Sequence, residues 1–292
     1  MEYVITGNDI RKKFKGFMLD IPQLQIPQGF ATALIGENGA GKTTLLNLLS
    51  GIRLDYQGQI HYFQQKAGID DPGIRDRIGY TGPGSYYLPH WTVKQVQEVN
   101  ELLFSKFQPK DYEKLCRELA IPGDKSKEAR NLSDGNRMKL MLAAVLSRDT
   151  ELLLLDEPAS PLDPLMRDKL CDMIREYLVS REGERSVFFS THNVADMENV
   201  TDYAIIMEQG RIVEQGFVED LKEKYVVVKG DAEYANQTSS ILVTQTRNRF
   251  GFEGICLAER LDKLAGMNVA VETPTLSQIC VAVMKAHSQL QF

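Results

Sequence analysis

The eight residues GENGAGKT, from Gly36 to Thr43, decide how this sequence is interpreted. They fit the spacing G-x-x-x-x-G-K-[ST], in which glycines let successive backbone N–H groups curve around a phosphate without a side chain in the way. Lys42 is a mobile cation for the phosphates, and the Thr43 hydroxyl suits Mg²⁺, a hard ion that prefers oxygen. A chance match in a chain of this length has a probability on the order of one per cent. The glycine-rich loop, residues 36–43, therefore predicts a nucleotide-phosphate site.

The sequence on either side of the glycine-rich loop supports this prediction. ATALIG, residues 31–36, is typical of a short buried strand, and residues 42–49 have the apolar pattern of a helix that ends at Gly51. Strand, glycine loop and helix together begin an α/β unit with a parallel sheet. The alternative is a glycine-rich turn with an accidental lysine, which this context disfavours.

Further apolar runs supply the rest of an α/β core. LLLL (152–155), SVFFS (186–190) and YAIIM (203–207) predict buried strands, and GRIVEQG (210–216) predicts a closing hairpin strand. Residues 164–178 predict a helix, with Leu165, Cys171, Ile174 and Leu178 at helical spacing. The core is therefore expected to be a parallel sheet with covering helices.

Two other regions have a different pattern. Residues 92–146 carry apolar side chains at helical spacing, among them Val96, Leu103 and Phe107, and predict a helical insertion. After Gly216, the runs YVVVK, SSILVTQ and MNVAVE suggest short strands, and TLSQICVAVMKA suggests a final helix. We place a boundary near residues 217–228.

Composition excludes several classes of function. The net charge of −6 argues against a nucleic-acid partner, because phosphate backbones are bound by basic surfaces. No run reaches the roughly 18 apolar residues of a membrane span, and the N-terminus lacks the apolar core of a signal peptide. The four cysteines form no CxxC pair, so we expect buried, reduced thiols. A cytoplasmic chain is expected, whose membrane role would come through a partner.

Acidic residues follow one of the predicted core strands. LLLLDEP places Asp156 and Glu157 at the end of a buried strand, and ligands of parallel sheets lie beyond the carboxyl ends of the strands. Asp156 is placed to hold Mg²⁺, and Glu157 to polarise a water toward the γ-phosphate. STH, residues 190–192, ends the next apolar strand, so His192 is placed to sense that phosphate. The alternatives are acids that merely cap a strand and a structural histidine.

Together these motifs resemble the ATP-binding subunit of an ABC transporter, over residues 3 to about 225. GENGAGKT resembles the family's Walker A loop, LLLLDEP its Walker B strand, and STH its switch-histidine segment. SPLD (160–163) resembles the D-loop, and LSDGN (132–136) occupies the place of the LSGGQ signature. Phe14, in KKFKGF, lies where the family has an aromatic ring that stacks on adenine, for which only a π face is needed.

The resemblance implies a P-loop NTPase fold: a parallel-sheet core, antiparallel N-terminal strands, a helical insertion and a small α+β C-terminal extension. It implies an ATPase domain over residues 1–220, with its insertion at about 82–146, and an accessory domain over residues 221–292. Two subunits would bind ATP and Mg²⁺ head to tail and drive a separate transmembrane permease from the cytoplasmic face. Bacterial exporter ATPases of the bacitracin and multidrug type, including Ytr-type subunits, resemble it most.

The resemblance also assigns roles to residues. Glu157 and His192 are catalytic, and Thr43 and Asp156 hold the metal. The nucleotide would contact Phe14, Gly36, Glu37, Asn38, Gly39, Ala40, Gly41, Lys42, Thr43, Thr44 and Asp163, with Ser133 and Gly135 acting on the partner's ATP.

One departure from the family pattern concerns the residue after IGYTG. Pro83 fills the position where the family has Gln or Glu, and its side chain cannot link Mg²⁺ to the membrane contact. The aromatic-rich run that follows, with Tyr86, Tyr87, Leu88 and Trp91, suits docking of a permease helix. Packing of these side chains inside the insertion is the alternative.

The other departure is Asp134, inside the signature. A unit charge about 4 Å from phosphate costs on the order of 4 kcal/mol at an effective dielectric near 20. However, Ser133 is a good helix N-cap and an acid is favoured in the first turn, so we expect Asp134 to point sideways toward Arg137 or Lys139. Since a homodimer would carry both departures at each site, weak intrinsic activity and a heterodimer with a second ATPase subunit are expected.

Two alternative functions remain open at the level of sequence. One is a soluble ABC-type ATPase in repair or translation, although the long coiled-coil insertion or second ATPase domain of such chains is not seen here. The other is a nucleotide-gated regulator with little hydrolysis. For the C-terminal region, regulation or dimer contact competes with simple packing against the core.

Overall fold

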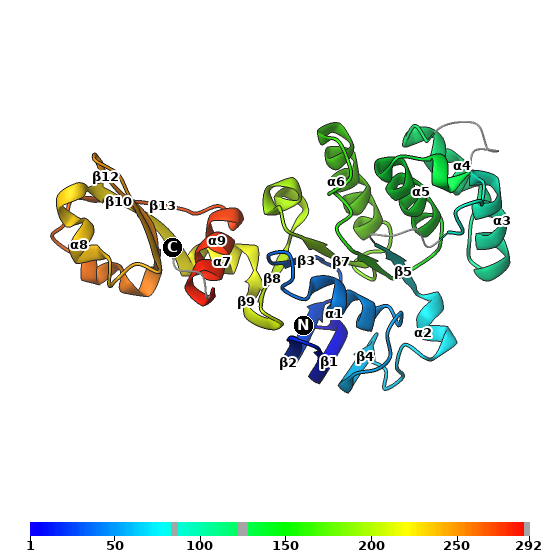
Figure 1. Cartoon of the computed structure of the whole chain (residues 1–292), viewed down its shortest axis with the longest axis horizontal. Coiled ribbons are helices and arrows are strands. Elements are labelled where there is room, and N and C mark those ends of the chain that lie inside the picture. Colours follow the sequence, from blue (N-terminus) through cyan, green and yellow to red (C-terminus); the bar gives the residue numbers. More distant parts are fainter. Residues whose placement is uncertain (83–86, 122–127, 289–292) are drawn as a thin grey trace.

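The computed structural model describes residues 1–82, 87–121 and 128–288. In these residues the strands form three sheets, and the chain is elongated (Figure 1). Helices of the insertion lie at one end, the C-terminal sheet lies at the other, and the largest sheet lies between them. The carboxyl edge of that largest sheet is where the predicted site residues are to be sought.

The largest sheet has six strands in the order β5-β6-β7-β3-β8-β9. All neighbours are parallel except β9, which closes the sheet antiparallel to β8 as a hairpin. This confirms the predicted core strands and the closing hairpin strand. The strands are β3 (Ala31–Ile35), β5 (Ile78–Thr81), β6 (Leu152–Leu155), β7 (Ser186–Thr191), β8 (Tyr203–Glu208) and β9 (Arg211–Phe217).

Both faces of this sheet are buried, which explains why its strands are apolar throughout. Strand alternation sends Leu153 and Leu155 into one hydrophobic cluster and Leu152 and Leu154 into the other. Helix α6 (Pro164–Val179) covers the first face and α1 (Lys42–Leu49) covers the second. Leu165, which the sequence places at helical spacing with Cys171, Ile174 and Leu178, does not share their face of α6: it stands in the first turn and is 84% exposed.

An antiparallel sheet in the order β2-β1-β4 covers α1 from the other side, as predicted for the N-terminal strands. It consists of β1 (Tyr3–Phe14), β2 (Phe17–Pro27) and β4 (Gln57–Tyr62). The tight β1–β2 connection, Lys15 and Gly16, brings Phe14 opposite Phe17. The two aromatic rings of KKFKGF therefore lie together at one corner of the sheet.

The predicted insertion is helical and has a core of its own. It contains α3 (Val93–Leu103), α4 (Pro109–Glu118) and α5 (Asp134–Leu146), and the short helix α2 (Pro72–Asp76) precedes it. Leu103 is exposed, and Phe107 is buried but follows the end of α3, so of these three residues only Val96 lies on a buried stripe of α3. The stripe fails because α3 ends at Leu103 and the chain turns there.

The aromatic run before α3 packs inward. Tyr87 and Trp91 lie against the core of the insertion with their ring centroids 6.3 Å apart, whereas Leu88 is half-exposed. For Tyr87 and Trp91 the structure therefore favours packing over an open docking surface. Pro83 and Tyr86 lie outside the described residues.

The C-terminal segment forms a third sheet, in the order β11-β12-β10-β13. YVVVK lies in β10, MNVAVE ends in β13, and the predicted final helix is α9. Only the end of SSILVTQ is a strand, and β12 was not predicted, because glycines at both its start and its middle interrupt the apolar pattern. The elements are α7 (Val218–Lys224), β10 (Tyr225–Asp231), α8 (Ala235–Thr238), β11 (Thr244–Arg247), β12 (Gly251–Leu257), β13 (Val269–Glu272) and α9 (Leu276–His287).

Helix α9 returns from this sheet and packs on the main one. Ile279, Cys280 and Val283 share a hydrophobic cluster with residues of β3, β6 and β7. A capping box of Thr275 and Gln278 starts the helix, and the Leu276 N–H donates to the Glu198 carboxylate at 2.9 Å. The last helix of the described residues therefore shares the hydrophobic core of the largest sheet.

This arrangement predicts the stability of variants in α9. We expect Ile279→Ala to lower the free energy of unfolding by about 3 kcal/mol, because it opens a cavity at a fully buried position. Val281→Ala on the same helix should cost less than about 1 kcal/mol, since its side chain is 45% exposed. Urea unfolding of both variants measures the difference. Equal losses would mean that α9 does not contribute to the core as described.

Candidate functional site

The glycine-rich loop joins β3 to α1 in a backbone conformation that requires glycine. Gly41 has φ of 108°, in the left-handed region, and it stands at the N-cap of α1. A Cβ on Gly36 would lie 2.4 Å from the carbonyl oxygen of Met207 in β8, too close to exist. In the described chain no side chain caps α1, and its first turn carries no acid. The free N–H groups and positive end of α1 therefore face an anion site.

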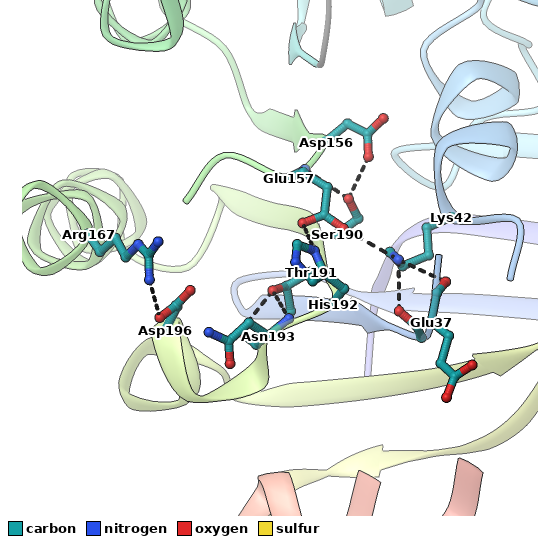
Figure 2. Close-up of polar contacts among 11 residues, drawn as sticks. Glu37, Lys42, Asp156, Glu157, Arg167, Ser190, Thr191, His192, Asn193 and Asp196 are labelled. Carbon is teal, nitrogen blue, oxygen red and sulfur yellow. Dashed lines mark hydrogen bonds and ion pairs between the residues drawn. The ribbon is translucent and has the colours of Figure 1, made fainter. Parts of the chain in front are cut away.

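Lys42 is buried in this loop, with its side chain 5% exposed. Its ammonium group donates to the carbonyl oxygens of Gly36, at 2.8 Å, and Glu37, at 3.2 Å. It also lies 3.4 Å from the Glu157 carboxylate, as Figure 2 shows. A buried cation held by backbone carbonyls and one carboxylate can exchange these contacts for phosphate oxygens.

Asp156 follows β6 and is fully buried. Its Oδ1 accepts a hydrogen bond of 2.6 Å from the Ser190 hydroxyl of β7. Its Oδ2 is buried with no hydrogen-bond partner among the residues that the structure describes. Burial raises the pKa of Asp156, although Ser190 and Thr43 oppose the shift. A carboxylate with one unsatisfied oxygen, beside a threonine hydroxyl, fits a hard cation such as Mg²⁺.

Glu157, the next residue, holds the centre of the site. Its backbone has φ of 51°, and its N–H donates to the Ser190 hydroxyl at 2.9 Å. Its carboxylate lies between Lys42 and His192, whose Nδ1 is 2.7 Å from Oε2 (Figure 2). The Ser190 side chain therefore connects both acids to β7, the strand that ends just before His192. Ser190 belongs to the STH segment, but sequence reasoning assigned it no role, because this contact depends on the pairing of β6 with β7.

The raised pKa of Asp156 predicts a pH dependence of stability without nucleotide. Because the folded pKa lies above the ordinary value of 3.8, the contribution of this group is complete below that value and is lost as pH rises through the raised pKa. We expect the free energy of unfolding of wild type, relative to Asp156→Asn, to fall as the pH rises above about 4. Urea unfolding at several pH values measures it, and parallel profiles would contradict the assignment.

A cavity of about 880 Å³ opens beside these residues. Eight of the predicted site residues line it: Asn38, Gly39, Gly41, Lys42, Thr43, Thr44, Glu157 and His192. Other lining residues were not predicted: Phe17, Gly82, Asp134, Arg137, Met138, Met141, Ser160 and Pro161. The cavity is therefore shared by the glycine-rich loop, the segment after β6 and the start of α5.

Phe17, rather than Phe14, is the aromatic ring on the cavity wall. The two ring centroids are 6.1 Å apart, and the Phe14 ring lies beside the cations of Lys12 and Arg53, at 5.3 and 5.2 Å. Adenine stacking by Phe14 stays a prediction, and Phe17 is a second candidate that sequence reasoning missed. Its signal was the second aromatic residue of KKFKGF, on the far side of the hairpin turn.

The signature segment, residues 132–136, starts helix α5. Ser133 is its N-cap and accepts from the Asn136 N–H at 3.3 Å, and Asp134 is the first helical residue. The Asp134 carboxylate forms an ion pair with Arg137, the first of the two partners expected for it, and both residues line the cavity. A Cβ on Gly135 would lie 2.8 Å from the Pro161 carbonyl oxygen, so this glycine permits close packing on the D-loop segment.

Asp163 has a structural contact in the described chain. It caps α6, accepting from the Met166 N–H at 3.1 Å. Together with Gly36, Glu37, Ala40, Asp156, Phe14, Ser133 and Gly135, it is a predicted site residue that does not line the cavity. Asp156, Gly36 and Glu37 nevertheless act on its lining residues through the hydrogen bonds described above.

Comparison with known proteins gives the same family as the motifs. A family model described as ABC transporter matches residues 19–160. The thiamine import ATP-binding protein ThiQ of Haemophilus ducreyi is 33% identical over 194 residues, which cover 65% of this chain and 89% of ThiQ. This chain belongs to the ABC transporter ATP-binding family. Members of the family bind ATP with Mg²⁺, which gives the ligands of the site.

Other ABC proteins extend the comparison. Human ATP-binding cassette sub-family A member 10 is 30% identical over 235 residues, covering 76% of this chain but only 15% of that protein. A dimeric ATP-binding cassette in a post-hydrolysis state, bound to ADP and Pi, has a TM-score of 0.63 at 17% identity, covering 73% of this chain and 98% of that one. The structural likeness shows the fold, and it confirms the predicted P-loop NTPase class.

Few side chains of this ABC chain are available to bind a metal ion at the site. Within residues 1–82, 87–121 and 128–288, no group of three or more His, Cys, Asp and Glu side chains is arranged to bind one. Mg²⁺ would therefore take Thr43 and Asp156 from the protein and its remaining oxygens from phosphate and water. In the same residues, no helix is both long enough and apolar enough to cross a membrane.

Proposed function

We propose that this chain hydrolyses ATP in a head-to-tail dimer and thereby drives a separate transmembrane permease. The observation that carries the proposal is the Lys42–Glu157–His192 network around the glycine-rich loop, next to the unsatisfied carboxylate of Asp156. A buried cation, an anion-binding helix end and a carboxylate beside a histidine are the parts that phosphoryl transfer to water requires.

Each residue has a distinct role in this proposal. Lys42 leaves the carbonyl oxygens of the loop and binds β- and γ-phosphate oxygens, while the N–H groups that begin α1 bind the β-phosphate. Glu157 orients the attacking water and accepts its proton. His192 holds the Glu157 carboxylate in place and contacts the γ-phosphate. When bound at Thr43 and Asp156, Mg²⁺ neutralises charge on the phosphate oxygens.

Ser190 is a positioning residue for both acids. Its hydroxyl donates to Asp156 and accepts from the Glu157 N–H, so one side chain fixes the spacing between the metal ligand and the base. Since both contacts are buried or half-buried, their loss would displace the two acids together. Ser190, two residues before His192, therefore affects hydrolysis through the positions of Asp156 and Glu157.

The second ATPase subunit is proposed to be a different chain. Pro83 cannot supply the polar side chain that the family places there, and Asp134 adds a negative charge to the signature. In a heterodimer these two departures fall on different nucleotide sites, whereas in a homodimer each site carries both. We expect slow ATP turnover by the purified chain alone and faster turnover with its partner. Vigorous, cooperative turnover without a partner would remove the case for heterodimerisation.

The permease is proposed to be an exporter, as the resemblance to bacitracin- and multidrug-type ATPases implies. Two relatives are named for the opposite direction, ThiQ for thiamine import and a tungstate uptake protein of Peptoclostridium acidaminophilum. The chain would lie on the cytoplasmic face of the membrane, held by the permease. Isolation of the chain from membranes together with its permease tests the location. Transport assays in inside-out vesicles test the direction, because ATP-dependent uptake into these vesicles indicates export.

We also propose a division of the chain into an ATPase domain, residues 1–220, and an accessory domain, residues 221–292. The third sheet and its cluster of buried side chains support it. The packing of α9 on the main sheet shows where the accessory residues contact the ATPase core. Limited proteolysis should cut first near the start of β10 if the division is correct. A first cut elsewhere would contradict these bounds.

A further inference from the structure

We propose that Arg137 neutralises Asp134, so that the signature segment of this chain can approach the phosphates of ATP despite its carboxylate. The inference rests on the proposed function, and it assigns Arg137 a positioning role that acts through Asp134. Asp134 is the position at which LSDGN differs from the family's LSGGQ signature, which has glycine there.

The pair lies on the same open face of the chain as the glycine-rich loop. Asp134 and Arg137 line the same cavity as Lys42, Thr43 and Glu157. Their side chains form an ion pair within the first turn of α5. The Asp134 side chain is 79% exposed, so it faces the open cavity rather than the core. In the head-to-tail dimer proposed above, a charge on this face acts on the triphosphate that the partner subunit brings against the signature segment.

The local backbone keeps the pair in register with the site. Ser133 caps α5, which fixes the helical turn that brings residues three apart onto one face. Gly135 packs on the Pro161 carbonyl oxygen, so the turn is held against the D-loop segment. The backbone that carries Asp134 and Arg137 is therefore held beside the D-loop segment.

The net charge of the pair explains why Arg137 is needed. Asp134 alone presents a charge of −1 to an anionic phosphate, whereas Asp134 with Arg137 presents no net charge, as a glycine would. In an open, hydrated cavity such a pair contributes little, because water screens it. When a second subunit closes the cavity and removes water, the unpaired carboxylate becomes costly. The pair therefore matters chiefly in the ATP-bound, closed state.

A double-mutant cycle tests the proposal in the assembled ATPase with its partner subunit. Arg137→Gln removes the cation and keeps much of the side-chain length, Asp134→Asn removes the acid, and the double variant removes both. We expect Arg137→Gln to raise the KM for ATP by about tenfold, and the double variant to return it to within about threefold of Asp134→Asn. Arg137→Lys should recover most of the loss, because it restores the positive charge.

Two further measurements exclude a merely structural effect. Arg175→Ala breaks a similar i,i+3 pair, with Asp172 on α6, and should leave the KM for ATP as it is. Thermal unfolding should show that all four proteins of the cycle are folded. If the loss of Arg137 raises the KM equally in wild type and in the Asp134→Asn variant, the proposal is overturned, since Arg137 would then contact phosphate directly. No rise in either protein would overturn it as well. If Lys42→Met also leaves ATP turnover intact, the proposed function itself has failed.

Discussion

Replacement of Glu157 by Gln is expected to lower MgATP turnover by about a hundredfold or more, with ATP binding retained. The structure gives the reason: the Glu157 carboxylate lies between Lys42 and His192, beside the end of the glycine-rich loop. Glutamine keeps the shape of this side chain and can still hydrogen-bond to His192, but it cannot accept a proton from water. The Glu157→Gln variant should therefore bind ATP normally but hydrolyse it slowly.

Turnover of ATP and size-exclusion chromatography with ATP measure the two effects. A trapped ATP-bound dimer is the expected species, because hydrolysis can no longer open it. Glu176→Gln is a matched control, since that residue is exposed on α6, outside the cavity. Unchanged turnover and no trapped dimer for Glu157→Gln would instead favour a nucleotide-gated regulator with little hydrolysis.

Replacement of Lys42 by Met is expected to weaken ATP binding by on the order of a hundredfold, because a buried cation that contacts phosphate is lost. Lys42 has a burial and a set of contacts that surface lysines lack: it is 5% exposed and donates to two loop carbonyls. Methionine retains the length of the side chain, so the shape of the loop should persist. The loss of ATP affinity therefore measures the contribution of the positive charge of Lys42.

The shift of the unfolding temperature caused by MgATP measures this affinity, because a ligand that binds only the folded state stabilises it. Lys94→Met on α3 is the control, since that lysine pairs only with the exposed Glu98 on the same helix in the described chain. If Lys42→Met and Lys94→Met show the same MgATP shift as wild type, then the glycine-rich loop does not bind phosphate in the way we propose.

The sequence predicted the parts of the fold that local rules determine. Helix α1 has the predicted bounds, and β6 coincides with LLLL, because the glycine-rich loop and the apolar runs constrain the backbone over a few residues. The first turn of α5 was also predicted, with Ser133 as cap and Asp134 paired with Arg137 or Lys139, of which the structure shows Arg137. Capping and i,i+3 pairing involve only neighbouring residues, so they can be inferred from spacing.

Contacts between distant segments could not be predicted in this way. Ser190 reaches Asp156 across 34 positions, and Phe17 reaches the cavity only because a hairpin turns there. The burial of Ile279 against the main sheet depends on how the third sheet directs the chain back. Such contacts depend on register and packing between elements, which periodicity within one element does not encode.

The packing of α9 has a practical consequence for dissecting this protein. A chain shortened at residue 220 would lose Leu276, Ile279 and Val283 from the hydrophobic cluster that they share with the main sheet, and with them the contact to Glu198. Apolar side chains that α9 now covers would meet water, so the shortened protein should aggregate or unfold more easily. Loss of activity on truncation would then report solubility rather than regulation. Point substitutions at exposed positions of β11 to β13 are therefore the better route to any signal that the accessory residues send.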